Sequence, residues 1–153
     1  MAPAGGSDGG MKILVFTEGT ATKHPSPEGF LDVPSFIPTN GAVERLTGWW
    51  RQGAVICYLT SERWNEDPTA VQDTLRRFGF PPGELFYRQE GEGYVDVVER
   101  VRPDVLIEDD CKSIGWDEVI GPKLRPEWGI RSIIVAEFGG LAHLPERCED
   151  LMR

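Results

Sequence analysis

Residues 11–22 read MKILVFTEGTAT, and this stretch decides the fold that we expect for the rest of the chain. The apolar run from Ile13 to Phe16 is typical of a strand that is buried on both faces. The polar sequence from Thr17 to Thr20 contains a glycine and predicts a turn directly after the strand. In open parallel α/β sheets, ligands bind at the carboxyl ends of the strands. The stretch therefore indicates a site for an anion, a metal ion or both, although strands more commonly end in a polar turn that has no such role.

Composition and charge exclude several classes of protein. The chain has 153 residues, of which 40% are hydrophobic and 27% are charged, as is ordinary for one globular domain. Its net charge of −9 argues against binding to nucleic acids and against adhesion to anionic membranes. No apolar run in the sequence is long enough to span a bilayer. The three cysteines lack C-x-x-C spacing, so we expect reduced thiols and a cytoplasmic protein.

The first ten residues differ in composition from everything that follows. The sequence MAPAGGSDGG has neither the basic start nor the apolar centre of a signal peptide. We therefore expect residues 1–10 to be a disordered leader or a remnant of expression, and residues 11–153 to form a single domain.

Apolar periodicity predicts alternating strands and helices along the chain. Four further strands are expected, at residues 54–59, 84–87, 104–107 and 130–136. Helices are expected between them, at residues 40–52, 67–78 and 94–101, and a polar tail at the end. This order predicts a Rossmann-like α/β fold, with a parallel sheet of about five strands and helices on both faces.

The first predicted helix shows two local signals. Thr39 or Asn40 is suited to cap its amino end. Of its two tryptophans, Trp50 is at a core position of the helical pattern, and Trp49 is expected to cover a neighbour only partly.

Residues 21–38 contain four prolines and show little periodicity. We expect an ordered loop that crosses the mouth of the site and is anchored by apolar residues or folded into a short β-flap. The candidate anchors are Phe30, Leu31, Val33, Phe36 and Ile37. His24 lies in the same loop, where a lone histidine is usually a solvated side chain without a catalytic role.

Polar side chains follow three of the predicted strands. Glu18 follows the first, Thr60 follows the second, and the acidic run Glu108–Asp110 follows the strand at 104–107. Because the carboxyl ends of parallel strands meet at one edge of a sheet, these groups should lie close together. Adjacent buried carboxylates raise one another's pKa, so the acidic run requires a cation unless it is a solvated turn. Magnesium fits best, since it prefers oxygen ligands.

Four short motifs, taken in order, resemble those of the haloacid dehalogenase (HAD) superfamily, whose members are mostly phosphohydrolases with an aspartate nucleophile. The segment Phe16–Thr20 resembles the D-x-D-G-T motif, and residues 58–61 resemble the strand that ends in Thr or Ser. Arg88 matches a lysine that precedes an aromatic residue by six positions. Asp109 and Asp110 resemble the acidic pair of the fourth motif.

The resemblance covers residues 11–144 and implies a role for each matching position. In the family the first aspartate attacks phosphorus and binds magnesium, and the second is a general acid and base. Here Phe16 stands at the first position and Glu18 at the second. The resemblance implies phosphate binding by Gly19, Thr20, Thr60 and Arg88, and magnesium binding by Asp109, Asp110 and the backbone carbonyl of Glu18.

A phenyl ring at position 16 neither attacks phosphorus nor binds magnesium. The sequence therefore predicts an HAD-like domain that binds a phosphorylated small molecule or macromolecule, with weak or absent phosphatase activity. The alternative is a divergent magnesium-dependent phosphohydrolase that uses Glu18 and Asp109. The intervals 22–54 and 61–84 are too short for a cap domain. By resemblance, capless members act on large substrates or close their site with a partner, so a homo-oligomer that covers the open site is also expected.

Overall fold

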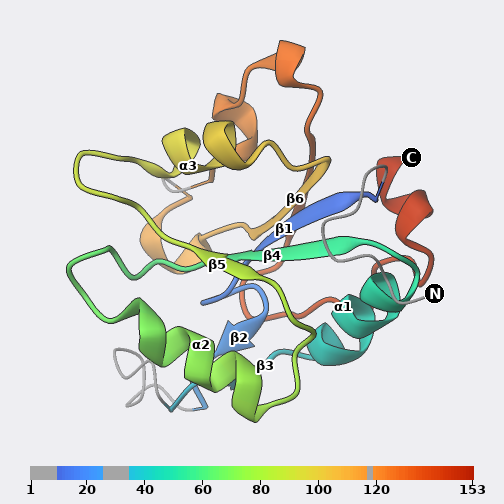
Figure 1. Cartoon of the computed structure of the whole chain (residues 1–153), viewed down its shortest axis with the longest axis horizontal. Coiled ribbons are helices and arrows are strands. Elements are labelled where there is room, and N and C mark those ends of the chain that lie inside the picture. Colours follow the sequence, from blue (N-terminus) through green and yellow to red (C-terminus); the bar gives the residue numbers. More distant parts are fainter. Residues whose placement is uncertain (1–9, 26–34, 117–118) are drawn as a thin grey trace.

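The computed structural model describes residues 10–25, 35–116 and 119–153 of the chain (Figure 1). Its main sheet has five strands in the order β5-β4-β1-β6-β7, and every neighbouring pair is parallel. These strands are β1 (Lys12–Phe16), β4 (Val55–Leu59), β5 (Glu84–Phe86), β6 (Val105–Asp109) and β7 (Arg131–Val135). The predicted parallel α/β sheet of about five strands is confirmed.

The apolar stretch at the start of the domain forms the centre of this sheet. β1 pairs with β4 on one side and with β6 on the other. Its residues Ile13, Leu14 and Val15 have no exposed surface, because a central strand of a parallel sheet is covered on both faces. The carboxyl ends of β4, β1 and β6 consequently lie next to one another, at the edge where the sequence predicts the site.

Three α-helices cover the sheet: α1 (Ala42–Arg51), α2 (Pro68–Arg77) and α3 (Tyr94–Val101). Leu46 of α1 and Val71 of α2 pack in the same cluster as Ile13. Val98 of α3 packs with Leu14, which points to the other side of β1 because adjacent strand residues alternate in direction. The helices therefore lie on both faces of the sheet, as predicted (Figure 1).

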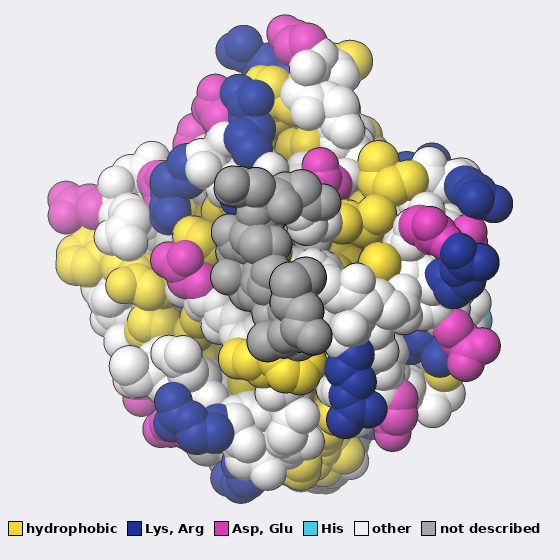
Figure 2. Space-filling model, turned by 45° about the vertical axis from the view of Figure 1, so that its right-hand side comes forward, with side chains coloured by type: hydrophobic (Ala, Val, Ile, Leu, Met, Phe, Trp, Pro, Cys, Tyr) yellow, Lys and Arg dark blue, Asp and Glu magenta, His cyan; other side chains and the backbone are white. Residues whose placement is uncertain are grey.

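Short 3₁₀-helices replace an α-helix between β6 and β7 in the part of the chain that is described. They are η3 (Lys112–Ile114), η4 (Gly121–Lys123) and η5 (Pro126–Trp128), and a fourth, η6 (Cys148–Met152), follows later. No helix among the described residues is long and apolar enough to cross a membrane. On the face seen in Figure 2, acidic and basic side chains are interspersed.

The loop predicted at residues 21–38 contains a small flap. β2 (Thr22–Lys23) and β3 (Ile37–Pro38) pair in antiparallel orientation, as one form of the prediction required. Phe36 anchors the flap, since its side chain is buried. The other candidate anchors Phe30, Leu31 and Val33, like residues 1–9 of the predicted leader, lie outside the described residues.

The helix α1 begins two residues later than predicted. Its N-cap is Gly41, which has a left-handed backbone with φ 74° and offers no capping side chain. The Thr39 hydroxyl, which was expected to cap the helix, instead donates to the carbonyl oxygen of Thr20 at 2.7 Å. The start of α1 is thereby joined to the turn that follows β1.

The predicted orientation of the tryptophan pair is wrong. Trp49 is fully buried and donates its Nε1–H to the carbonyl oxygen of Pro145 at 2.9 Å, whereas Trp50 is half-buried. The physical reason is that α1 is covered by the C-terminal residues as well as by the sheet. The expected polar tail is also wrong, because Leu141 and Leu151 of this region are buried in the core.

Candidate functional site

A pocket of about 270 Å³ lies at the carboxyl edge of the sheet, where the sequence predicts the site. One part of its wall is aromatic and consists of Phe16, His24, Phe36, Tyr94 and Phe138. Another part carries carboxylates, from Glu18, Glu62, Glu108, Asp109 and Glu137. The strand ends expected to meet therefore do meet, and they enclose a cavity that is both apolar and strongly acidic.

The turn after β1 holds the carboxylate of Asp109 in place. The Thr20 hydroxyl donates to Asp109 Oδ1 at 2.7 Å. Gly19 has φ 92°, and a Cβ added to it would lie 2.8 Å from the same oxygen. Only glycine both adopts this backbone conformation readily and allows so close an approach. Gly19 and Thr20, which were predicted to bind phosphate, thus contact a carboxylate of β6 in this structure.

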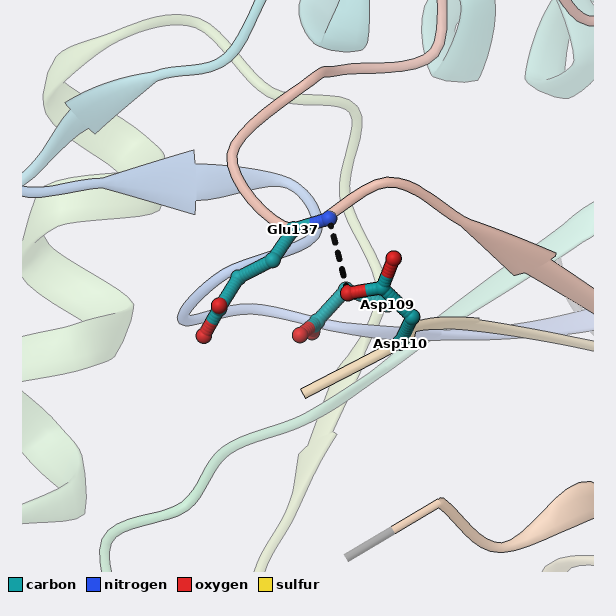
Figure 3. Close-up of side chains that lie close together, drawn as sticks. All are labelled: Asp109, Asp110 and Glu137. Carbon is teal, nitrogen blue, oxygen red and sulfur yellow. Dashed lines mark hydrogen bonds between the residues drawn. The ribbon is translucent and has the colours of Figure 1, made fainter. Parts of the chain in front are cut away.

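Three acidic side chains converge beside this turn. Ligand oxygens of Asp109, Asp110 and Glu137 lie within 4.8 Å of one another (Figure 3). Asp110 Oδ1 accepts the backbone N–H of Glu137 at 3.3 Å and that of Lys112 at 3.1 Å. The cluster therefore joins the end of β6 to the residues after β7. It contains the two aspartates that were predicted to bind magnesium.

Burial and neighbouring charges destabilise the ionised form of Asp109. Burial raises the pKa of Asp109, and the nearby carboxylate of Glu137 raises it further. Hydrogen bonds from the Thr20 hydroxyl and the Cys111 N–H oppose this rise in pKa. A hard cation bound to the carboxylates would offset the same repulsion, and Mg²⁺ and Ca²⁺ are the hard cations that prefer oxygen ligands.

Glu108 belongs to the predicted acidic run but not to this cluster. β6 continues through Asp109, two residues beyond the predicted end of the strand, because Glu108 and Asp109 still pair with β7. Adjacent strand residues point to opposite faces, so the two carboxylates separate. The two carboxylate oxygens of Glu108 accept hydrogen bonds from the backbone N–H groups of Ile120 at 2.8 Å and Gly121 at 2.6 Å. Burial raises the pKa of Glu108, and these two hydrogen bonds oppose the rise.

Glu18 reaches from the turn after β1 to the end of β4. Its Oε1 accepts hydrogen bonds from the Thr60 hydroxyl at 2.9 Å, the Ser61 N–H at 2.7 Å and the Ser61 hydroxyl at 2.9 Å. Thr60 was predicted to bind phosphate, and Glu18 to act as acid and base. The structure brings the two side chains together, but as partners of each other.

Arg88 lies next to these groups, at the end of β5. Its Nη2 donates to the carbonyl oxygen of Ser61 at 2.7 Å, and its guanidinium carbon lies 4.1 Å from the centre of the Tyr94 ring. The Nε–H of Arg88 is buried and has no hydrogen-bond partner among the described residues. Arg88 and Thr60 therefore lie in one region, although Arg88 does not line the pocket itself.

Phe16 is the last residue of β1, and it is the residue that the sequence resemblance matches to the family's nucleophile. The side chain is 8% exposed, lines the pocket and packs edge-on against Tyr94, with ring centres 5.1 Å apart. Since Arg88 stacks on Tyr94, the three side chains form a continuous layer. This layer carries no nucleophile and no metal ligand at position 16.

Sequence reasoning missed one member of the acidic cluster and misjudged one side chain. Glu137 directly follows the fifth predicted strand, so the rule that grouped Glu18, Thr60 and Asp109 also applied to it. His24 is not simply solvated, because it is half-buried in the pocket wall, with its ring centre 4.9 Å from that of Phe138. Nothing in the spacing of the loop indicated this contact.

Comparisons with known proteins bear on the fold. No model of a known protein family matches the sequence, and no curated protein matches it. The structure is similar to the crystal structure of D,D-heptose 1,7-bisphosphate phosphatase from B. bronchiseptica complexed with magnesium and phosphate. The two share 16% sequence identity and a TM-score of 0.53, over 93% of this chain and 94% of that one. This likeness supports the Rossmann-like α/β fold that the sequence predicts.

Proposed function

We propose that the protein is an HAD-like domain that binds a phosphorylated ligand together with magnesium and hydrolyses it slowly or not at all. The observation that carries the proposal is the position of Phe16. Phe16 is the last residue of β1, and its ring lines the pocket beside the acidic cluster. The ring has no atom that can attack phosphorus. The similarity to a phosphatase complexed with magnesium and phosphate supports the binding part.

The acidic cluster has the chemistry that magnesium requires. Mg²⁺ takes oxygen ligands at about 2.0–2.1 Å in octahedral geometry, so neighbouring ligand oxygens lie roughly 3 Å apart. Those of Asp109, Asp110 and Glu137 all lie within 4.8 Å of one another, so small side-chain movements suffice. The backbone carbonyl of Glu18, implied by the family resemblance, would be a further ligand. Bound magnesium would neutralise the carboxylates and provide positive charge for a phosphate.

The charge of the pocket makes binding of phosphate depend on the metal. Its described lining contains five carboxylates and no lysine or arginine. Residues 1–9, 26–34 and 117–118, which lie outside the described ranges, contain no lysine or arginine either. A phosphate dianion is therefore repelled unless a cation enters with it. Arg88 is the cationic side chain that the resemblance implies for phosphate binding, and it donates to the carbonyl oxygen of Ser61, the residue after Thr60.

Calorimetry with magnesium and inorganic phosphate tests this function. We expect weak magnesium binding, and phosphate binding only when magnesium is present. Asp109→Asn should abolish both, because it removes a charged ligand but keeps the acceptor for Thr20. Glu99→Gln is the matched control, since it removes one carboxylate at an exposed position of α3. Phosphate binding that is undiminished by Asp109→Asn would refute the proposal.

The alternative activity is a divergent magnesium-dependent phosphohydrolase that uses Glu18 and Asp109. One observation favours it, because both carboxylates line the same pocket. It predicts that the unmodified protein hydrolyses aryl phosphates with magnesium and that Glu18→Gln abolishes the turnover. Absence of turnover in protein that binds magnesium and phosphate would exclude it.

We also propose a setting for this function. Three free cysteines are compatible with the reducing cytoplasm. Among the described residues no cap domain covers the pocket, so a phosphorylated macromolecule or small molecule has access, and a second copy of the chain would close it. Sedimentation with and without magnesium and phosphate tests this association.

A further inference from the structure

Three hydrogen-bond donors converge on one oxygen atom of Glu18. They are the Thr60 hydroxyl, the Ser61 hydroxyl and the Ser61 backbone N–H, all within 2.9 Å of Oε1. Hydroxyl and backbone N–H groups gathered in this way at a strand end form a site for a negatively charged oxygen. Thr60 has no exposed surface, so its hydroxyl requires a partner inside the protein or in a bound ligand.

The donors are held in place by contacts that do not involve Glu18. The Thr60 N–H donates to the carbonyl oxygen of Phe86 at 3.1 Å, which fixes it to β5. The carbonyl oxygen of Ser61 accepts from Arg88, and the guanidinium of Arg88 stacks on Tyr94. Glu18, in contrast, is half-buried and reaches the donors through a flexible side chain. The donor site is therefore preformed, and Glu18 is its movable occupant.

Electrostatics favours the exchange of Glu18 for a stronger anion that carries its own cation. None of the ion pairs formed by the described residues includes Glu18. Its carboxylate faces others in the pocket, and Glu18 is among the neighbours that raise the pKa of Glu62. Hydrogen bonds alone therefore hold Glu18 at the donors. Release of its side chain into solvent relieves repulsion within the pocket.

We infer, on the basis of the proposed function, that Glu18 is an internal ligand which occupies the anion subsite formed by Thr60 and Ser61. A phosphate oxygen that binds there must displace the Glu18 carboxylate. The measured affinity for phosphate is then the intrinsic affinity multiplied by the fraction of molecules in which Glu18 has left the subsite. A monoanion that binds the donors weakly therefore does not displace Glu18, whereas a phosphate that also binds magnesium does.

Titration of inorganic phosphate into the magnesium-loaded full chain tests the inference. We expect Glu18→Ala to bind phosphate about tenfold more tightly than the wild type, or better, because the donors no longer have an internal partner. Glu18→Gln should show a smaller gain, since an uncharged amide oxygen is a weaker acceptor. Combining Glu18→Ala with Thr60→Val and Ser61→Ala should remove the gain.

Glu62→Ala is the matched control for charge. Glu62 also contributes a carboxylate to the pocket wall, but only its backbone N–H contacts Thr60, at 3.1 Å. This variant removes one negative charge and leaves the donors occupied by Glu18. We expect it to change phosphate affinity by less than about threefold, as for a partly exposed charge in water.

Each alternative result has a defined meaning. Equal gains in Glu18→Ala and Glu62→Ala would overturn the inference, since general repulsion would explain both. Equal binding by the wild type and Glu18→Ala, or weaker binding by Glu18→Ala, would also overturn it and leave the proposed function intact. No phosphate binding by any variant with magnesium would overturn both. Glu18→Gln provides the same comparison if Glu18→Ala does not fold.

Discussion

Replacing Phe16 with aspartate tests how much of a metal site remains around it. The phenyl ring is 8% exposed and packs against Tyr94, so its loss creates a cavity. Truncation of a buried phenylalanine costs about 3–5 kcal/mol. Roughly 1 kcal/mol of this cost comes from loss of the contact between the two aromatic rings. A new carboxylate also joins an acidic pocket. We therefore expect Phe16→Asp to lower the free energy of unfolding by about 5 kcal/mol without metal.

Magnesium should restore part of this stability, because the new carboxylate lies at the strand end beside Asp109. A ligand at 100 times its dissociation constant stabilises a protein by about 2.7 kcal/mol. Urea denaturation with and without magnesium measures the effect. Phe16→Asn is the control, since it leaves the same cavity and the asparagine side chain has nearly the shape of aspartate but no charge. The aspartate variant should also form a phosphoenzyme from an aryl phosphate, which mass spectrometry detects.

The result that would refute this reasoning is equal stabilisation of the aspartate and asparagine variants by magnesium. It would mean that position 16 does not face the metal cluster. In that case the resemblance of the β1 turn to the family motif would have no consequence for metal binding.

Other predictions concern stability. Gly19→Ala should lower the free energy of unfolding by about 3 kcal/mol by urea denaturation, because a Cβ would lie 2.8 Å from Asp109. Gly91→Ala, with a similar positive φ of 80° and no atom within 4 Å of the added carbon, should lose only about 1–2 kcal/mol. Trp49→Phe should lose roughly 2–3 kcal/mol and Trp50→Phe less than about 1 kcal/mol in the same assay, since only Trp49 is fully buried and hydrogen-bonded. Burial raises the pKa of Asp109, so between about pH 4 and this raised pKa the folded state binds more protons than the unfolded state. In the presence of a chelator, stability should therefore fall as the pH rises through the raised pKa, and this decline should be smaller in Asp109→Asn.

The sheet and the location of the site were predictable because both follow from local patterns and one topological rule. Apolar runs marked all five strands, and parallel order places their carboxyl ends at one edge. Boundaries were less predictable where pairing extends a strand. β6 includes Glu108 and Asp109 because β7 continues beside them, and no local signal shows how far a neighbour reaches.

Side-chain partners were the part that the sequence did not reveal. Glu18 and Thr60 were expected at the same edge. The donors that form hydrogen bonds with the Glu18 carboxylate, however, depend on the distance between the turns after β1 and β4. The Nε1–H of Trp49 finds its acceptor in the carbonyl oxygen of Pro145, which is remote in sequence. Both features are non-local, so periodicity within one helix or strand contains no information about them.

The link between Gly19 and the residues after β7 has a consequence for folding. The N–H of Phe138 donates to the carbonyl oxygen of Gly19 at 2.8 Å, and the residues that follow bind α1 through Arg45. This contact joins residues far apart in sequence, so it forms later and more slowly than the local hydrogen bonds of the turn after β1. Until β7 is in place, the pocket therefore lacks the part of its wall that Glu137 and Phe138 provide.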